Sequence, residues 1–147
     1  MTAATTFFSQ NEKDQILKAV KEAENNTSGE IRVHVESRCD EAPLDRAAFL
    51  FKRLEMHKTQ LRNGVLFYLA IDDRKFAILG DAGINAKVPS NFWDSTKQTV
   101  LQQFKDEDYA QGLAQGIRMA GIELKAHFPH MDNDQNELND DISFGSN

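Results

Sequence analysis

The stretch RNGVLFYLAIDDRKFAILGDAG, residues 62–83, decides the fold. Its two runs of aliphatic and aromatic residues, 65–71 and 75–79, are typical of buried strands, and turn formers bound each run. Only Asp72 and Asp73 are available to reverse the chain between them, and so short a connection requires an antiparallel hairpin. Acidic residues therefore follow the strands, in loops of the kind that often carry binding sites.

The residues before this hairpin predict a helix, a strand and a second helix. Residues 9–24 begin with a capping serine, Ser9, place Glu12 three positions later and then repeat apolar residues at helical spacing. Residues 30–37 alternate apolar with polar side chains, which indicates a strand covered on one face and near an edge of the sheet. Helical spacing returns over 44–60, and a helix between two strands is the usual crossover of a parallel pair. The sheet is therefore predicted to be mixed.

Two further helices are predicted after the hairpin. Ser90 or Asn91 can cap the first of them. Asp106 or Asp108 can start the second, which Pro129 stops. The pattern predicts an α/β fold in which four main helices accompany a small mixed sheet of three to four strands.

The chain divides at the end of the last predicted helix. Residues 1–129 are expected to form a single domain, and residues 130–147 are expected to be an acidic, flexible tail because they are too polar to fold alone. Apolar side chains that could anchor this tail are Leu138, Ile142 and Phe144.

Composition narrows the class of protein. A chain of 147 residues is long enough to bury a core, and its single cysteine allows no internal disulfide. No segment has the pattern of a signal peptide or a membrane span, so we expect a soluble, cytoplasmic protein that does not bind membranes. The net charge of −6 argues against nucleic acid as a partner and favours a divalent cation or a protein surface.

Carboxylates in loops and first helical turns suggest a calcium or magnesium site. Clustered carboxylates repel one another unless a cation neutralises them. Turn geometry at the hairpin and the helix macrodipole can also account for several of these residues without any ion. The acidic set is Asp72, Asp73, Asp81, Asp94, Asp106 and Asp108.

The pattern GDAG at 80–83 lacks the spacing and the lysine of a phosphate-binding loop. We expect its glycines to supply positive φ after the third strand and to aim Asp81 and Asn85 across the strand ends.

Cysteine and histidine chemistry is not favoured. Cys39 precedes Arg46 by one residue too many for a thiol-phosphatase loop, and the three carboxylates between them would repel phosphate, so a structural cysteine is expected. His34 is expected on the polar face of the first strand and His57 late in a helix. His127 and His130 flank the end of the last helix and could share a transition metal only with ligands from elsewhere in the chain.

In several motifs, and in their order, the chain resembles the TPM domain family, which includes a plant thylakoid-lumen acid phosphatase. The resemblance covers residues 28–129. It is carried by SGEIRVHVE at 28–36, RNGVLFYLAIDDRKFAILGDAGI at 62–84, FWD at 92–94, and Phe104 with DYAQG at 108–112. The HFP at 127–129 and the tail resemble the short, soluble bacterial form of the family.

The resemblance implies an α/β/α sandwich with an acidic pocket at one end of the sheet, a divalent ion in some members and phosphatase activity in some. Arg74 is the basic residue that would join this pocket. The implied pocket residues are Asp72, Asp73, Asp81 and Asp108, with Asp94 and Asn85 as second choices.

Three functions remain open at this point. The first is a Ca²⁺- or Mg²⁺-binding module that responds to the ion and docks on a protein partner. The second is a metal-assisted acid phosphatase in which Asp81 orients water or acts as the nucleophile. The third is an interaction domain whose acids are simply solvated.

Overall fold

The computed structural model describes residues 4–130 and 142–145. Its four strands form one mixed sheet in the order β3-β2-β1-β4, in which β1 pairs in parallel with β2 and β4, and β2 pairs antiparallel with β3. This confirms the α/β class and the mixed sheet. The elements are α1 (Ala4–Phe7), α2 (Gln10–Glu24), β1 (Glu30–Glu36), α3 (Pro43–Arg53), β2 (Gly64–Ala70), β3 (Lys75–Gly80), α4 (Ala82–Asn85), α5 (Phe92–Lys105), α6 (Tyr109–His127) and β4 (Ser143–Phe144).

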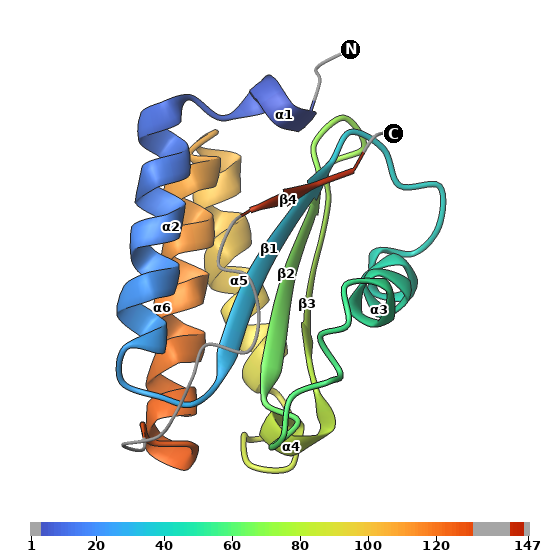
Figure 1. Cartoon of the computed structure of the whole chain (residues 1–147). Helices are drawn as coiled ribbons and strands as arrows, with labels where there is room; N and C mark the ends of the chain where they lie inside the picture. Colours follow the sequence, from blue (N-terminus) through green and yellow to red (C-terminus); the bar gives the residue numbers. More distant parts are fainter. Residues whose placement is uncertain (1–3, 131–141, 146–147) are drawn as a thin grey trace.

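The helices cover both faces of the sheet. Helices α2, α5 and α6 lie on one face and α3 on the other, as the α/β/α sandwich requires (Figure 1). Strand β2 alternates between two apolar layers: Phe67 packs among residues of the α2–α5–α6 side, and Tyr68 packs on the α3 side. All seven residues of β2 are buried, which explains why its sequence is a continuous apolar run.

Caps fix where two of the main helices begin. Ser9 and Glu12 form the predicted capping box, in which the Ser9 hydroxyl accepts from the Glu12 amide at 3.1 Å and the Glu12 carboxylate accepts from the Ser9 amide at 2.9 Å. Asp108 caps α6, where its carboxylate accepts from the Gln111 amide at 3.2 Å. These caps place Glu12 and Asp108 at fixed positions near the start of their helices.

Helix α3 ends earlier than its sequence pattern predicts. Glu55 has φ 60°, the Glu55 amide donates to Lys52, and the Met56 amide donates back to Phe51 at 2.9 Å, which together form a Schellman motif. Glycine usually occupies this left-handed position and marks the end of a helix in the sequence. Because Glu55 stands there instead, the sequence pattern does not show where α3 ends. His57 therefore lies beyond α3 and not late in a helix, as had been predicted.

The hairpin loop is longer than the two residues inferred from the sequence. Ala70 pairs with Lys75, so residues 71–74 connect β2 to β3, and Arg74 adopts φ 53°. Ile71 leaves the strand for this turn, and its amide donates to Glu36 at the end of β1. The loop is thereby fixed to the neighbouring strand.

The GDAG glycines serve a different purpose from the one predicted. No glycine in the described part of the chain has a positive φ. Gly83 instead lies against the preceding loop: a Cβ at this position would stand 2.1 Å from the carbonyl oxygen of Leu61 and 2.6 Å from that of Arg62. The requirement for glycine here is close approach of backbone to backbone.

Part of the C-terminal segment joins the sheet. Ser143 pairs with His34 and Phe144 with Val35, so β4 covers the open edge of β1. Three residues of this segment were proposed as anchors. Two of them, Ile142 and Phe144, are half-buried against the core, and the third, Leu138, lies outside the described residues. Among the described residues, no helix is both long and apolar enough to cross a membrane.

Candidate functional site

The predicted site residues lie at two opposite ends of the sheet. We call the end with the 71–74 turn the hairpin end and the end with α4 the α4 end (Figure 1). They are separated by the six residues of β3, a distance of about 20 Å. Asp72, Asp73 and Asp108 lie at the hairpin end, and Asp81, Asn85 and Asp94 at the α4 end. The expectation that all six share one pocket is therefore corrected.

The reason for the separation is the course of the chain after the hairpin. Strand β3 carries the chain away from Asp72, and α5 carries it back before α6 starts at Asp108. The Trp93 indole donates to the Asn85 side chain at 2.7 Å, which places the first turn of α5, including Asp94, beside α4. Sequence patterns identified these elements without fixing which ends meet.

At the hairpin end, the three predicted aspartates differ in how many of their carboxylate oxygens already accept a hydrogen bond. Asp73 accepts from the Cys39 amide at 2.7 Å through one carboxylate oxygen, and Asp108 caps α6. The Asp72 carboxylate is exposed and makes no ion pair or hydrogen bond within residues 4–130 and 142–145, although its backbone amide donates to Ser37 at 2.8 Å. Asp72 thus combines a fixed backbone with a free carboxylate.

An open pocket of about 500 Å³ lies beside Asp72. Carboxylates from three separate elements line it, namely Glu12, Asp72 and Glu107, and Arg74 supplies the one cation among the lining residues. Phe7, Ile71 and Tyr109 complete the wall. No three His, Cys, Asp or Glu side chains of the described residues are close enough together to hold a metal ion as they stand. A cation here would require the exposed carboxylates to turn inwards.

At the α4 end, Asp81 is already neutralised. It is 7 % exposed, and Arg62 donates to both of its oxygens at 2.7 and 2.8 Å. The Asp81 carboxylate also accepts from the Ala82 amide at 2.7 Å, which caps α4. The ion pair raises the pKa of Arg62. Asp81 therefore holds two loops together and has little capacity left for an ion or for attack on a substrate.

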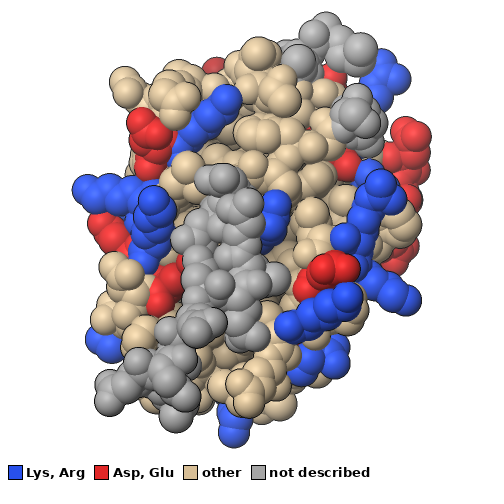
Figure 2. Space-filling model, in the orientation of Figure 1, with Lys and Arg blue, Asp and Glu red and all other residues tan. Residues whose placement is uncertain are grey.

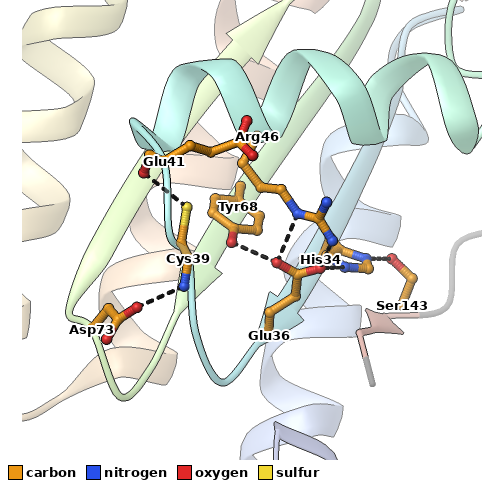
Figure 3. A network of polar contacts seen from close by, with 8 residues as sticks. All are labelled: His34, Glu36, Cys39, Glu41, Arg46, Tyr68, Asp73 and Ser143. Carbon is orange, nitrogen blue, oxygen red and sulfur yellow. Dashed lines mark hydrogen bonds and ion pairs between the residues drawn. The ribbon is translucent and has the colours of Figure 1, made fainter. Parts of the chain in front are cut away.

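A buried polar network on the α3 side was not recognised from the sequence (Figure 3). Glu36 is 1 % exposed, and its carboxylate accepts from two nitrogens of Arg46 and from the Tyr68 hydroxyl at 2.6 Å. His34 lies 3.3 Å from Glu36 through Nε2 and 2.6 Å from the Ser143 hydroxyl through Nδ1. The alternation in β1 does identify these positions as polar, but the structure buries them instead of exposing them.

This network shifts three ionisation equilibria. Burial lowers the pKa of His34, against the opposing effect of Glu36. Desolvation raises the pKa of Glu36, but the hydrogen bonds from Arg46 and Tyr68 outweigh it and the net pKa is lowered. Burial, together with the hydrogen bond to Glu36, raises the pKa of Tyr68. The network therefore holds an ionised Glu36 beside the His34 imidazole, whose two ring nitrogens lie within hydrogen-bond distance of Glu36 and Ser143.

We predict that the protein loses stability as the pH falls from about 6.5. Because burial lowers the pKa of His34, the unfolded chain takes up a proton at higher pH than the folded chain does. Stability is then lost progressively down to the folded pKa, and Glu36 adds a further loss below its ordinary value of 4.5. Urea unfolding of the wild type and of His34→Gln at pH 7.5 and 5.5 tests this. A wild-type pH dependence equal to that of the variant would contradict it.

The fold and the pocket together define a class: an α/β/α sandwich with acidic loops at the carboxyl ends of its two central parallel strands. The chain belongs to the TPM domain family, whose profile matches residues 1–122. No sequence among curated proteins matches it.

Solved structures agree with this assignment. The chain is 43 % identical to the BA42 protein of the psychrophilic bacterium Bizionia argentinensis, over 99 % of this chain and 100 % of that one, with a TM-score of 0.89. The N-terminal domain of a P. gingivalis protein is 19 % identical, with 86 % and 83 % coverage and a TM-score of 0.70. That of the cg2496 protein from Corynebacterium glutamicum is 17 % identical, with 82 % and 76 % coverage and a TM-score of 0.63. The last two show a shared fold only.

Proposed function

We propose that this TPM domain binds a divalent cation, Ca²⁺ or Mg²⁺, at the hairpin end and acts as an ion-responsive binding module. The observation that carries the proposal is the open pocket lined by three carboxylate residues, Glu12, Asp72 and Glu107, and by one cation, Arg74. Carboxylate oxygens are the ligands that these hard cations prefer, and an ion between the carboxylates would relieve their repulsion.

The expected ligands follow from what each carboxylate already does. Asp72 and Glu107 are exposed and free to turn, whereas one oxygen of Glu12 is engaged in the capping box. Asp73 and Asp108 stand next to these residues in the chain and each keep one oxygen that accepts no hydrogen bond within the described residues. Such a site keeps several waters on the ion and is expected to bind at millimolar concentration.

Titration of Ca²⁺ and Mg²⁺ into the metal-free protein, followed by amide NMR shifts, tests this proposal. We expect shifts at Asp72, Glu107 and Asp108, and none at Asp81 and Asn85, which lie at the α4 end and serve as internal references. Asp72→Asn should weaken binding about tenfold, since it removes a charged ligand.

Asp94→Asn is the matched control, because Asp94 is also an exposed aspartate but lies in the first turn of α5 at the α4 end. Flat titration curves for the wild type would reject the cation and favour an interaction domain with solvated acids. Equal weakening by both substitutions would show that net charge, and not a site, attracts the ion.

A metal-assisted phosphatase is the second candidate, and the observation that favours it is Arg74 at the acidic pocket. Phosphoryl transfer needs positive charge beyond the metal to stabilise the transition state. The nucleophile first considered, Asp81, is paired with Arg62 at the other end of the sheet, so Asp72 is the better candidate for orienting water. Hydrolysis of p-nitrophenyl phosphate with Mg²⁺ should then be lost in Asp72→Asn and retained in Asp94→Asn; activity retained in both variants would indicate a contaminant.

A further inference from the structure

A second pocket opens beside the acidic one, between α5, the start of α6 and the hairpin. It has a volume of about 270 Å³. Its floor is formed by Leu69 of β2 and Phe76 of β3, which are 1 % and 3 % exposed. Leu101, Phe104 and Tyr109 form the walls and are only half-buried. We call this the α5 pocket.

The aromatic residues that line the α5 pocket pack against one another. Phe104 packs edge-on against Phe76 with ring centroids 5.3 Å apart, and its ring is tilted against that of Tyr109 with centroids 4.9 Å apart. Gly112 of α6 makes this possible, because a Cβ there would stand 2.8 Å from the Phe104 ring. Three aromatic rings in contact thus give the pocket a continuous apolar surface.

The charged residues that line this pocket are both cations. Arg74 and Lys105 are exposed residues that line it, and no carboxylate does. Neither side chain makes an ion pair or a hydrogen bond with the residues described, 4–130 and 142–145. The protein carries a net charge of −6, and on the face seen in Figure 2 acidic and basic side chains are interspersed. Two unpaired cations around an apolar hollow are therefore a local feature.

The pocket between α3 and β3 differs in that a carboxylate, Asp81, lines it together with its two cations, Lys52 and Arg62. Phe51 and Leu79 make part of it apolar, but Arg62 at its wall is already paired with Asp81. An anion there would have to compete with a carboxylate held by two hydrogen bonds. The α5 pocket, by contrast, has two cations and no carboxylate among its lining residues.

We propose that the α5 pocket binds a small hydrophobic monocarboxylate. The apolar body would lie on the Phe76–Phe104–Tyr109 surface, and the carboxylate would reach Arg74 and Lys105 at the mouth. The pocket is slightly smaller than those that hold drug-sized molecules, so a short aliphatic or single-ring acid fits its size. This site adjoins the proposed cation site, and Ile71, Arg74 and Tyr109 line both pockets.

The probe we choose is octanoate, added to the intact protein in EDTA at constant ionic strength and followed by methyl and amide NMR. Octan-1-ol has the same chain without the charge, and acetate has the charge without the chain. We expect octanoate to shift the methyl signals of Leu69 and Leu101, acetate to leave them unmoved, and octan-1-ol to bind about two- to fivefold more weakly than octanoate.

Two variants on the same helix test the charge. Lys105→Gln should weaken octanoate binding about two- to fivefold and leave octan-1-ol binding unchanged. Lys97→Gln, two turns nearer the start of α5 and outside the pocket lining, should change neither. Lys105 is exposed and Lys97 is half-buried, and neither belongs to the buried core, so loss of folding is not expected. The proposal is overturned if octanoate leaves Leu69 and Leu101 unshifted, or if octan-1-ol binds as tightly as octanoate. Equal weakening by both variants would also overturn it.

This experiment is independent of the proposed cation site. EDTA removes divalent ions, so octanoate binding in EDTA cannot depend on them. Flat Ca²⁺ curves together with normal octanoate binding would reject only the cation proposal, and the reverse result would reject only the carboxylate proposal.

Discussion

Replacing Glu36 with alanine is expected to lower the free energy of unfolding by about 3 kcal/mol. The residue is 1 % exposed, and its carboxylate is the shared acceptor for Arg46, Tyr68 and His34. Removing it leaves the buried Tyr68 hydroxyl and the Arg46 guanidinium without their acceptor, and uncompensated buried polar groups are costly. The Arg46 side chain is 25 % exposed, so water can partly solvate its guanidinium after the substitution. The expected loss therefore lies at the lower end of the range for breaking a buried ion pair.

Urea unfolding with a constant m-value measures this loss. Glu36→Gln keeps an acceptor oxygen and should cost less than Glu36→Ala, because it removes the charge without emptying the site. Glu22→Gln is the control: its ion pair with Lys18 is exposed and should be worth less than about 0.5 kcal/mol. A loss of that small size for Glu36→Ala would show that the network does not stabilise the fold.

Gly83→Ala is expected to destabilise the protein by about 3 kcal/mol, even though alanine is the better helix former. Gly83 lies in α4, where propensity alone would predict a gain of up to about 1 kcal/mol. The new Cβ would stand 2.1 Å from the Leu61 carbonyl oxygen, a backbone atom that cannot swing aside as a side chain could. The Gly83 amide also donates to Arg62 at 2.8 Å, so the two segments cannot separate without losing that bond.

Thermal or urea unfolding of Gly83→Ala checks the sign. Ala82→Gly is the control, because it exchanges the same two residue types in the opposite direction at the preceding position, which is exposed. It should lower the free energy of unfolding by no more than about 1 kcal/mol, the difference in helix propensity between alanine and glycine. A stabilised Gly83→Ala protein would mean that α4 does not approach the 61–62 loop as described.

Much of the fold could be predicted because its signals are local. The capping box at Ser9 and the apolar run of β2 are recorded in adjacent residues, and both were confirmed. The end of α3 could not be placed in this way. The helix is followed by a glutamate in the left-handed conformation, Glu55, where the usual glycine signal is missing.

The candidate site was less predictable than the fold. Asp72 was identified as a strand-end carboxylate, and it does line an acidic pocket. Its partners Glu12 and Glu107 were not foreseen, since they come from the first turn of α2 and from the turn after α5. Asp81 was assigned to the same pocket, but it pairs with Arg62 at the opposite end of the sheet.

Periodicity, capping and turn length act between neighbours in the chain, and they were enough to predict the three longer strands, the main helices, the mixed pairing and the acidic character of the strand-end loops. Strand β4 and the pairing of charged side chains depend on tertiary packing. This packing brings Arg62 to Asp81, buries Glu36 among three partners and leaves Arg74 and Lys105 around an apolar hollow. Such contacts depend on how whole helices and strands pack in space. The sequence around one charged residue therefore does not show which other residue it will meet.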